Sequence, residues 1–118
     1  MSQNVILELL PATTYDGGGT ANVYSVTGNS QPAASYYLGN QDLQTINLKT
    51  TNFTGNIKIE ATLSANSATT DYFEVYKLSN CANANLSMYQ NIDGNFVYMR
   101  ATIEDFQWGV VQFVKLSY

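Results

Sequence analysis

The chain has 118 residues and a mass of 13.0 kDa, which is enough for one hydrophobic core and too little for two. Charged residues make up only 12% of it, histidine is absent and the net charge is −4. Five scattered lysines and arginines cannot line a phosphate backbone, so nucleic acid is excluded as an expected partner. We therefore predict a single domain over residues 1–118.

Hydrophobic residues alternate with polar ones along the chain, with the period of two that β-strands produce. In chain order, the expected strands are 5–10, 21–26, 35–38, 45–49, 56–63, 72–78, 86–90, 95–103 and 110–116. Turn residues such as Thr54-Gly55 and Asp93-Gly94 separate several of them. The pattern predicts an all-β fold, a single antiparallel β-sandwich of jelly-roll or immunoglobulin-like type with eight or nine strands.

The same alternation assigns side chains to an inner and an outer face. Within 56–63, Ile57 and Ile59 point to one side while Lys58 and Glu60 point to the other. The predicted core is Val5, Leu7, Leu9, Ile46, Leu48, Ile57, Ile59, Leu63, Phe73, Val75, Phe96, Tyr98, Val111, Phe113 and Leu116. The asparagine-rich segment 80–91 is expected to be loop and edge strand, because asparagine and serine side chains compete with helical hydrogen bonds.

The sequence lacks the usual equipment for catalysis. Cys81 has no histidine or neighbouring cation to activate its thiol, and the acids Glu104 and Asp105 fit a turn after a strand. Zinc would need histidine or several cysteines, and calcium would need closely spaced acids, which the chain does not offer. We predict no enzymatic activity, no catalytic residues, no metal site and no cofactor.

The N-terminal residues carry no basic region followed by an apolar segment, so we expect synthesis in a cytoplasm without a signal peptide. The longest apolar runs are far shorter than the roughly 20 residues that cross a bilayer, so no membrane partner is expected. The single cysteine cannot form an internal disulfide.

Aromatic residues are the feature that rises above background, with nine tyrosines, five phenylalanines and one tryptophan. Such residues often serve only as cross-strand packing. Exposed among asparagine and glutamine, they can instead stack on sugar rings, which predicts a carbohydrate-binding or host-recognition module. Low charge with abundant tyrosine also fits a subunit interface. The candidate residues for a sugar or subunit contact are Tyr36, Tyr37, Tyr72, Tyr76 and Trp108.

Four segments of the chain carry a resemblance to a known class: FTGNIKIEATL at 53–63, DYFEV at 71–75, DGNFVYMRA at 93–101 and VKLSY at 114–118. Together they resemble small uncharacterised virion structural proteins of contractile-tailed phages that infect cyanobacteria and other marine bacteria. The resemblance implies a capsid decoration, neck or tail component, located in the virion, that forms a homo-oligomer and docks on other virion proteins. Tyr72 stands where a tryptophan is expected. The carbohydrate-binding or host-recognition module is the alternative.

Overall fold

The structure is a computed structural model that describes residues 6–15, 24–33, 43–66 and 71–118. These residues form strands and no helix, and so contain no helix that could cross a membrane. The strands are β1 (Ile6–Leu10), β2 (Thr13–Tyr15), β3 (Tyr24–Thr27), β4 (Gln31–Pro32), β5 (Leu43–Thr62), β6 (Phe73–Ala84), β7 (Ser87–Asp93) and β8 (Tyr98–Ser117). All eight belong to one antiparallel hydrogen-bonded sheet.

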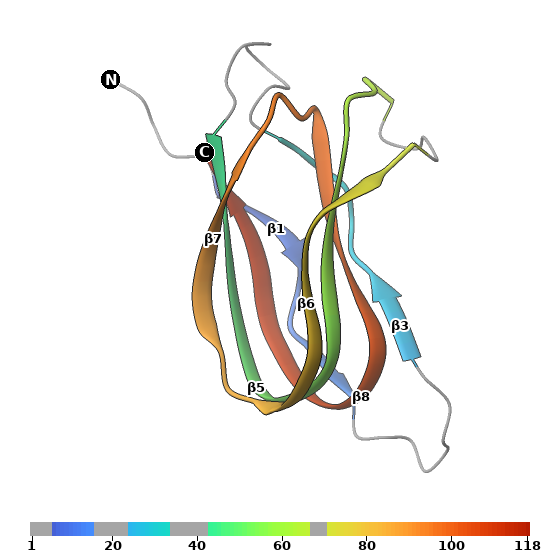
Figure 1. Cartoon of the computed structure of the whole chain (residues 1–118), viewed down its shortest axis with the longest axis vertical. Coiled ribbons are helices and arrows are strands. Elements are labelled where there is room, and N and C mark those ends of the chain that lie inside the picture. The colour runs from blue at the N-terminus through green and yellow to red at the C-terminus, as the bar shows by residue number, and fades with distance from the viewer. Residues whose placement is uncertain (1–5, 16–23, 34–42, 67–70) are drawn as a thin grey trace.

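Bends in the long strands fold this sheet into two layers (Figure 1). In the first layer, the first half of β5 pairs with β7 and with the second half of β8, which also pairs with β1 and β2. In the second layer, the second half of β5 pairs with β6 and with the first half of β8, which also pairs with β3 and β4. The predicted all-β antiparallel sandwich is therefore confirmed.

Several predicted strands turn out to be parts of longer ones. Segments 45–49 and 56–63 both lie in β5, except for Leu63, and 110–116 joins most of 95–103 in β8. The segment 80–91, expected to be loop and edge strand, lies largely in β6 and β7. Predicted strand 35–38 and residues 21–23 lie outside the described residues. The long strands were divided in the prediction because their turn residues bend the chain without ending its pairing.

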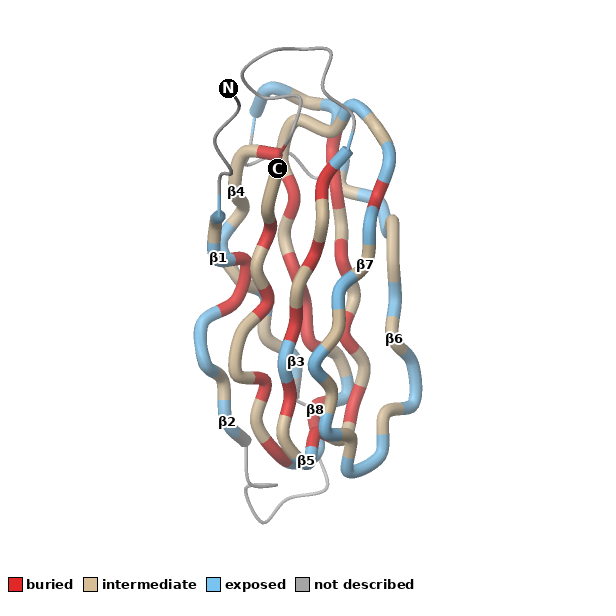
Figure 2. The backbone as a smooth tube through the Cα atoms, turned by 90° about the vertical axis from the view of Figure 1, so that its left-hand side faces the viewer, coloured by how far each residue is buried: buried red, intermediate tan, exposed pale blue. Residues whose placement is uncertain are grey.

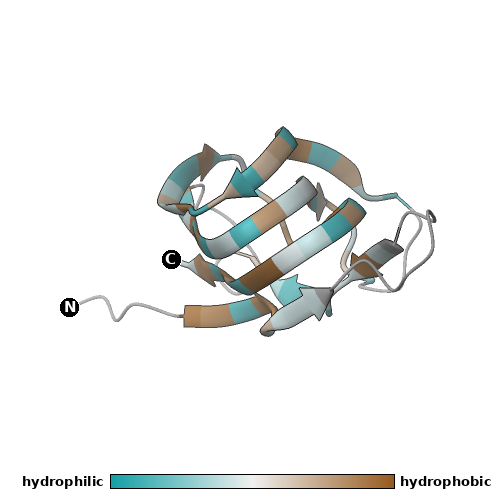
Figure 3. Cartoon of the chain, turned by 90° about the horizontal axis from the view of Figure 1, so that it is seen from below, coloured by the Kyte–Doolittle hydropathy of each residue, from teal (hydrophilic) through white to brown (hydrophobic). Residues whose placement is uncertain are grey.

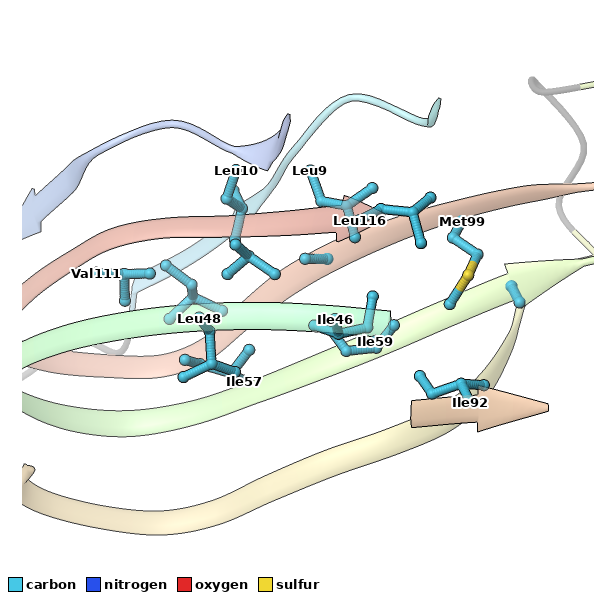
Figure 4. Close-up of a cluster of buried hydrophobic side chains, with 14 of the residues drawn as sticks. Leu9, Leu10, Ile46, Leu48, Ile57, Ile59, Ile92, Met99, Val111 and Leu116 are labelled. Carbon is cyan, nitrogen blue, oxygen red and sulfur yellow. The ribbon is translucent and has the colours of Figure 1, made fainter. Parts of the chain in front are cut away.

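The core lies between the two layers. Burial alternates along β5 and β8, as the strand period requires (Figure 2). Ile46 and Leu48 from the first half of β5 enter the same cluster as Ile57 and Ile59 from its second half (Figure 4). The predicted core residues that are buried are Leu9, Ile46, Leu48, Ile57, Ile59, Val111 and Leu116.

Two predicted core residues are exposed, and for these the prediction is wrong. Leu63 is 64% exposed because it follows the last paired residue of β5. Phe73 is 41% exposed at the start of β6, where its ring meets Phe96 edge to face with the ring centroids 5.7 Å apart. Both lie where the second layer ends, so no neighbouring strand covers them. Val5 lies outside the described residues, while Leu7, Val75 and Phe96 are only partly buried against the core.

Strand register explains why Tyr98 is also only partly buried. It lies opposite Thr62, so the next residue, Met99, takes the inward position opposite Ala61. Met99 is fully buried and was not predicted. The predicted period of two is correct for this strand, but the residues that point inward are displaced by one position from those predicted.

A β-bulge accounts for Phe113, another predicted core residue that is only partly buried. Lys49 lies opposite Phe113, but the next residue, Thr50, lies opposite Val111, so no residue of β5 lies opposite Gln112. An extra residue reverses the direction of the side chains that follow it. Phe113 therefore lies on the outer surface of the first layer. There, the Lys115 ammonium lies over the Phe113 ring, 4.4 Å from the ring centroid.

Candidate functional site

Of the predicted site residues, the structure describes Tyr72, Tyr76 and Trp108, and it does not bring these three together. Tyr36 and Tyr37 lie outside the described residues. Tyr76 lies opposite Ile59 on β6 and packs against the core, so its ring is directed between the layers.

Tyr72, just before β6, lies against the outer surface of the second layer. Its hydroxyl group and the Ser30 hydroxyl are hydrogen-bonded at 2.7 Å, and the Arg100 guanidinium lies 3.9 Å from the centre of its ring. Arg100 belongs to β8 and Ser30 to the segment between β3 and β4, so Tyr72 reaches across the layer. One face of its ring is occupied by the cation, and a sugar could not stack there without displacing it.

Tyr72 adjoins a surface that we call the charged face, made by the outward side chains Lys58, Glu60, Lys77, Arg100 and Glu104 of the second layer. Glu60 accepts a hydrogen bond from Arg100 Nε at 3.0 Å and lies 3.7 Å from Lys58 Nζ. Glu104 lies 3.3 Å from Lys58 Nζ and 3.7 Å from Lys77 Nζ. Every cation of the charged face therefore already has a carboxylate partner.

The sheet bends at an edge that we call the folded edge, consisting of residues 52–56 of β5, 80–85 of β6 and its connection to β7, and 105–109 of β8. Residues there adopt positive φ angles: 50° at Asn52, 58° at Asn80, 47° at Asn83, 53° at Asp105 and 102° at Gly109. Asparagine, aspartate and glycine are the residues that adopt this left-handed conformation most readily. Figure 3 views the molecule from this end, where polar and apolar residues alternate along the bent strands.

Side chains of the folded edge hold the backbone where the regular ladder is interrupted. Asn56 Oδ1 accepts the Asn80 N–H at 2.7 Å, and Asn56 Nδ2 donates to Asp105 Oδ2 at 3.2 Å. The Asn83 N–H donates to Thr54 Oγ1 at 3.1 Å. Because Asn56 links β5 to both β6 and β8, it fixes the three strands relative to one another.

Aromatic rings fill the interior of the folded edge. At one glycine of this edge there is no space for a side chain. Phe53 and Phe106 are fully buried and meet edge to face, with their ring centroids 5.3 Å apart. A Cβ atom on Gly109 would overlap the carbonyl oxygen of Asn52. The backbones of β5 and β8 therefore approach closely here.

Trp108 lies on the outside of the folded edge. It is opposite Thr54, whose hydroxyl group accepts the Asn83 N–H, and it is 50% exposed. Exposed amide side chains occur in the folded edge at Asn52, Asn83 and Gln107. The folded edge thus combines an exposed indole ring with amide and hydroxyl groups, the combination on which the sequence-based sugar hypothesis rests.

The residues that join Trp108 at the folded edge are not among the predicted site residues. Asn52 and Thr54 fall between the predicted strands 45–49 and 56–63, and Asn83 falls in the segment expected to be loop and edge strand. Asparagine and glycine residues in three separate segments of the chain were the available signal, because these residues favour positive φ angles. Only the pairing of β5 with both β6 and β8 shows that the three positions meet.

Cys81 also belongs to the folded edge, where it lies opposite Gly55. Desolvation by burial raises the pKa of its thiol, so the thiol stays protonated near neutral pH. Over the parts of the chain that the structure describes, no group of three or more histidine, cysteine, aspartate or glutamate side chains could hold a metal ion.

No protein-family model matches the sequence, and no curated protein matches it. Solved structures are similar in fold. The C-terminal CBM6 of LamC, a marine laminarinase from Zobellia galactanivorans, superposes with a TM-score of 0.51 at 7% identity, over 98% of this chain and 100% of its own. This likeness shows a shared β-sandwich fold. CBM29_1, a family 29 carbohydrate binding module from Piromyces equi, gives a TM-score of 0.48 at 10% identity, over 98% and 91% of the two chains.

Proposed function

We propose that this protein is a carbohydrate-binding module that holds a neutral glycan against Trp108 at the folded edge. The observation that carries the proposal is the half-exposed Trp108 ring on an edge that also carries exposed amide groups. Sugar rings present apolar C–H faces that pack against a flat aromatic surface, while their hydroxyl groups need hydrogen-bond partners around it. Asn52, Asn83 and Gln107 supply such partners.

The hydrogen bonds that hold the folded edge support this proposal. Asn56 and Thr54 of β5 accept the backbone N–H groups of Asn80 and Asn83, so β5 and β6 are tied together at the bend. A surface that is already ordered loses little conformational entropy when a ligand binds. The fold shared with the CBM6 of LamC is consistent with the same role.

The charge of the folded edge favours a neutral ligand over an acidic one. Asp105 is the only charged residue among 52–56, 80–85 and 105–109, and the chain as a whole carries a net charge of −4. A uronate or sulfate group near Trp108 would meet a carboxylate and find no cation of the folded edge to pair with.

The single tryptophan makes the proposal directly testable, because all tryptophan fluorescence comes from Trp108. Titration with neutral polysaccharides, laminarin among them, should shift or quench this fluorescence, and alginate should not. Trp108→Ala should abolish retardation in gels that contain the bound polysaccharide. Phe73→Ala is the matched control, since Phe73 is 41% exposed at the start of β6, outside the folded edge. Unchanged binding by Trp108→Ala, equal loss in both variants, or no response to any neutral polysaccharide overturns the proposal.

We further propose that binding occurs without hydrolysis. Glu60 pairs with Arg100, and Glu104 pairs with Lys58 and Lys77, so neither carboxylate of the charged face is free to flank a glycosidic bond at Trp108. Incubation with the bound polysaccharide should release no reducing ends over a day, and release that survives repurification would contradict this.

Residence in a virion, with self-association and docking on other virion proteins, stays a prediction that comes from the sequence resemblance. It is compatible with sugar binding, because an appendage of a phage particle can serve both purposes. Detection of the protein in purified particles by mass spectrometry would test it separately from glycan binding.

A further inference from the structure

The edges of the folded sheet differ in how well they are protected from pairing with another strand. The pairing of β6 with β5 has three register shifts, and that of β1 with β8 has one. On the edge formed by β3 and β4, the pairing of β3 is shifted and β4 has only two residues. Interrupted or short strands of this kind discourage edge-to-edge association.

Strand β7 has none of these protections. Its seven residues pair with β5 in one unbroken register from Leu43–Asp93 to Lys49–Ser87. It contains no proline, and its one charged residue, Asp93, is at its end. Figure 2 shows β7 at the margin of the first layer, and no described strand pairs with its outer side.

The hydrogen-bonding direction of β7 follows from its neighbour. Leu86 lies opposite Thr50 in the continuation of the same register, and the Thr50 N–H donates to the Leu86 carbonyl at 2.8 Å. Because bonded pairs alternate in an antiparallel ladder, the backbone groups of Met88, Gln90 and Ile92 point to β5. Those of Ser87, Tyr89, Asn91 and Asp93 point outward, away from the sheet.

The hydrogen bond of the Asn91 carbonyl agrees with the outward direction of this group. It accepts a hydrogen bond from the Nε2 atom of the neighbouring Gln90 side chain at 3.0 Å, which is the sort of local partner that an unpaired edge carbonyl takes. The oxygen has a second lone pair, so this contact does not prevent pairing with another strand.

We propose that β7 pairs with β7 of a second copy of this chain, antiparallel and about a two-fold axis. Placing Gln90 opposite its own copy brings all four outward-facing residues of each strand into hydrogen-bonded positions. The other opposed pairs are Ser87 with Asp93, Met88 with Ile92, and Tyr89 with Asn91.

The side chains suit this register. Asp93 meets Ser87, so no like charges are opposed, and Met88 meets the apolar side chain of Ile92 on the inner face. Tyr89, 69% exposed in one copy, lies beside Asn91 of the other on the outer face. The first layers of the two copies become one continuous sheet. A second copy is favoured over a strand of another protein because, in this register, the side chains of β7 are complementary to those of β7 itself.

The experiment is light scattering over a dilution series of the intact chain, combined with residue-resolved hydrogen exchange. The mass should rise toward twice 13.0 kDa with concentration. In the concentrated sample the amides of Ser87, Tyr89, Asn91 and Asp93 should exchange at least about tenfold more slowly than in the dilute one. The inward amides of Met88 and Gln90 should be protected in both.

Asn91→Pro removes one outward N–H and leaves the ladder with β5 intact, so it should remain a monomer. Asn91→Ser is the matched control, because it also removes the contact of Asn91 Oδ1 with Thr45 but keeps the N–H, and it should still dimerise. A wild-type monomer at all concentrations, a trimer or ring, a dimeric Asn91→Pro, or unprotected outward amides in a dimer each overturns the proposal. If Asn91→Pro fails to fold, the wild-type exchange result still decides. The inference does not depend on glycan binding, which Asn91→Pro should retain.

Discussion

The folded edge and the charged face are built mainly from the same three strands, β5, β6 and β8, but they use their polar groups differently. On the charged face, carboxylates pair with cations, and Glu60 is only 12% exposed beneath its partners. At the folded edge, Asn56 and Thr54 bond to backbone N–H groups, while Trp108 is left half-exposed. A surface whose charges satisfy one another offers few free groups to a ligand. An edge whose polar groups hold the backbone can present an apolar ring.

The largest expected loss of stability comes from removing the aromatic packing inside the folded edge. Phe53→Ala should lower the free energy of unfolding by about 3–5 kcal/mol, because it removes a fully buried ring packed against Phe106. Urea denaturation measures the loss. Phe53→Leu is the control and should cost much less, since it keeps most of the apolar volume. Equal stability of Phe53→Ala and wild type would show that the bend does not depend on this packing.

Substitution of Gly109 tests the close approach of the β5 and β8 backbones at the same edge. Gly109→Ala should cost about 3 kcal/mol, because its φ of 102° disfavours a side chain and the added Cβ would overlap the Asn52 carbonyl. Thermal unfolding followed by circular dichroism gives the difference. Gln107→Ala, two residues earlier and exposed, should change the stability by about 0.5 kcal/mol or less. Similar effects of the two substitutions would argue against a close approach of the strands.

The charged face should give smaller effects, graded by burial. Glu60→Gln should cost roughly 1–2 kcal/mol, because it weakens the short contact with Arg100 at a poorly exposed position. Lys77→Gln should cost about 0.5 kcal/mol or less, because the 3.7 Å pair with Glu104 is more exposed. Denaturation at low and high salt measures both. A larger effect at Lys77 than at Glu60 would contradict the network described.

A further small effect concerns a left-handed residue with an exposed side chain. Asn83→Ala should cost about 1 kcal/mol because alanine tolerates the φ of 47° less well than asparagine does. Asn83→Gly should be nearly neutral, since glycine adopts this conformation without a steric penalty. The order of the two unfolding midpoints tests the conformation, and a more stable alanine variant would reject it.

The alternation of residues predicted much of the fold because it reports directly on burial. Ile57 and Ile59 are inside and Lys58 and Glu60 outside, as expected. The prediction failed where the signal was not local. Phe113 was placed in the core because the extra residue Gln112 that turns it outward is visible only once β5 and β8 are paired.

The candidate site was harder to predict than the core. Composition pointed to aromatic residues among amides without saying which aromatic ring lies on which surface. Tyr76 faces the core and Tyr72 packs under Arg100, and both outcomes depend on partners distant in sequence. Thr54-Gly55 correctly marked a change of chain direction, but a turn signal does not say whether neighbouring strands bend with it. That joint bending places Thr54, Asn83 and Trp108 on one edge.

The pairing of β8 also has a consequence for how the chain folds. Each of β1, β2, β3 and β4 pairs with β8, which follows them all in the chain. Among the described strands, only the pairings of β5 with β6 and with β7 can form before β8 is in place, so neither layer is complete until then. Contacts between such distant segments make folding slow. The sandwich therefore cannot close during synthesis until nearly all of β8 has left the ribosome, and until then the apolar faces of the strands already made are open to aggregation.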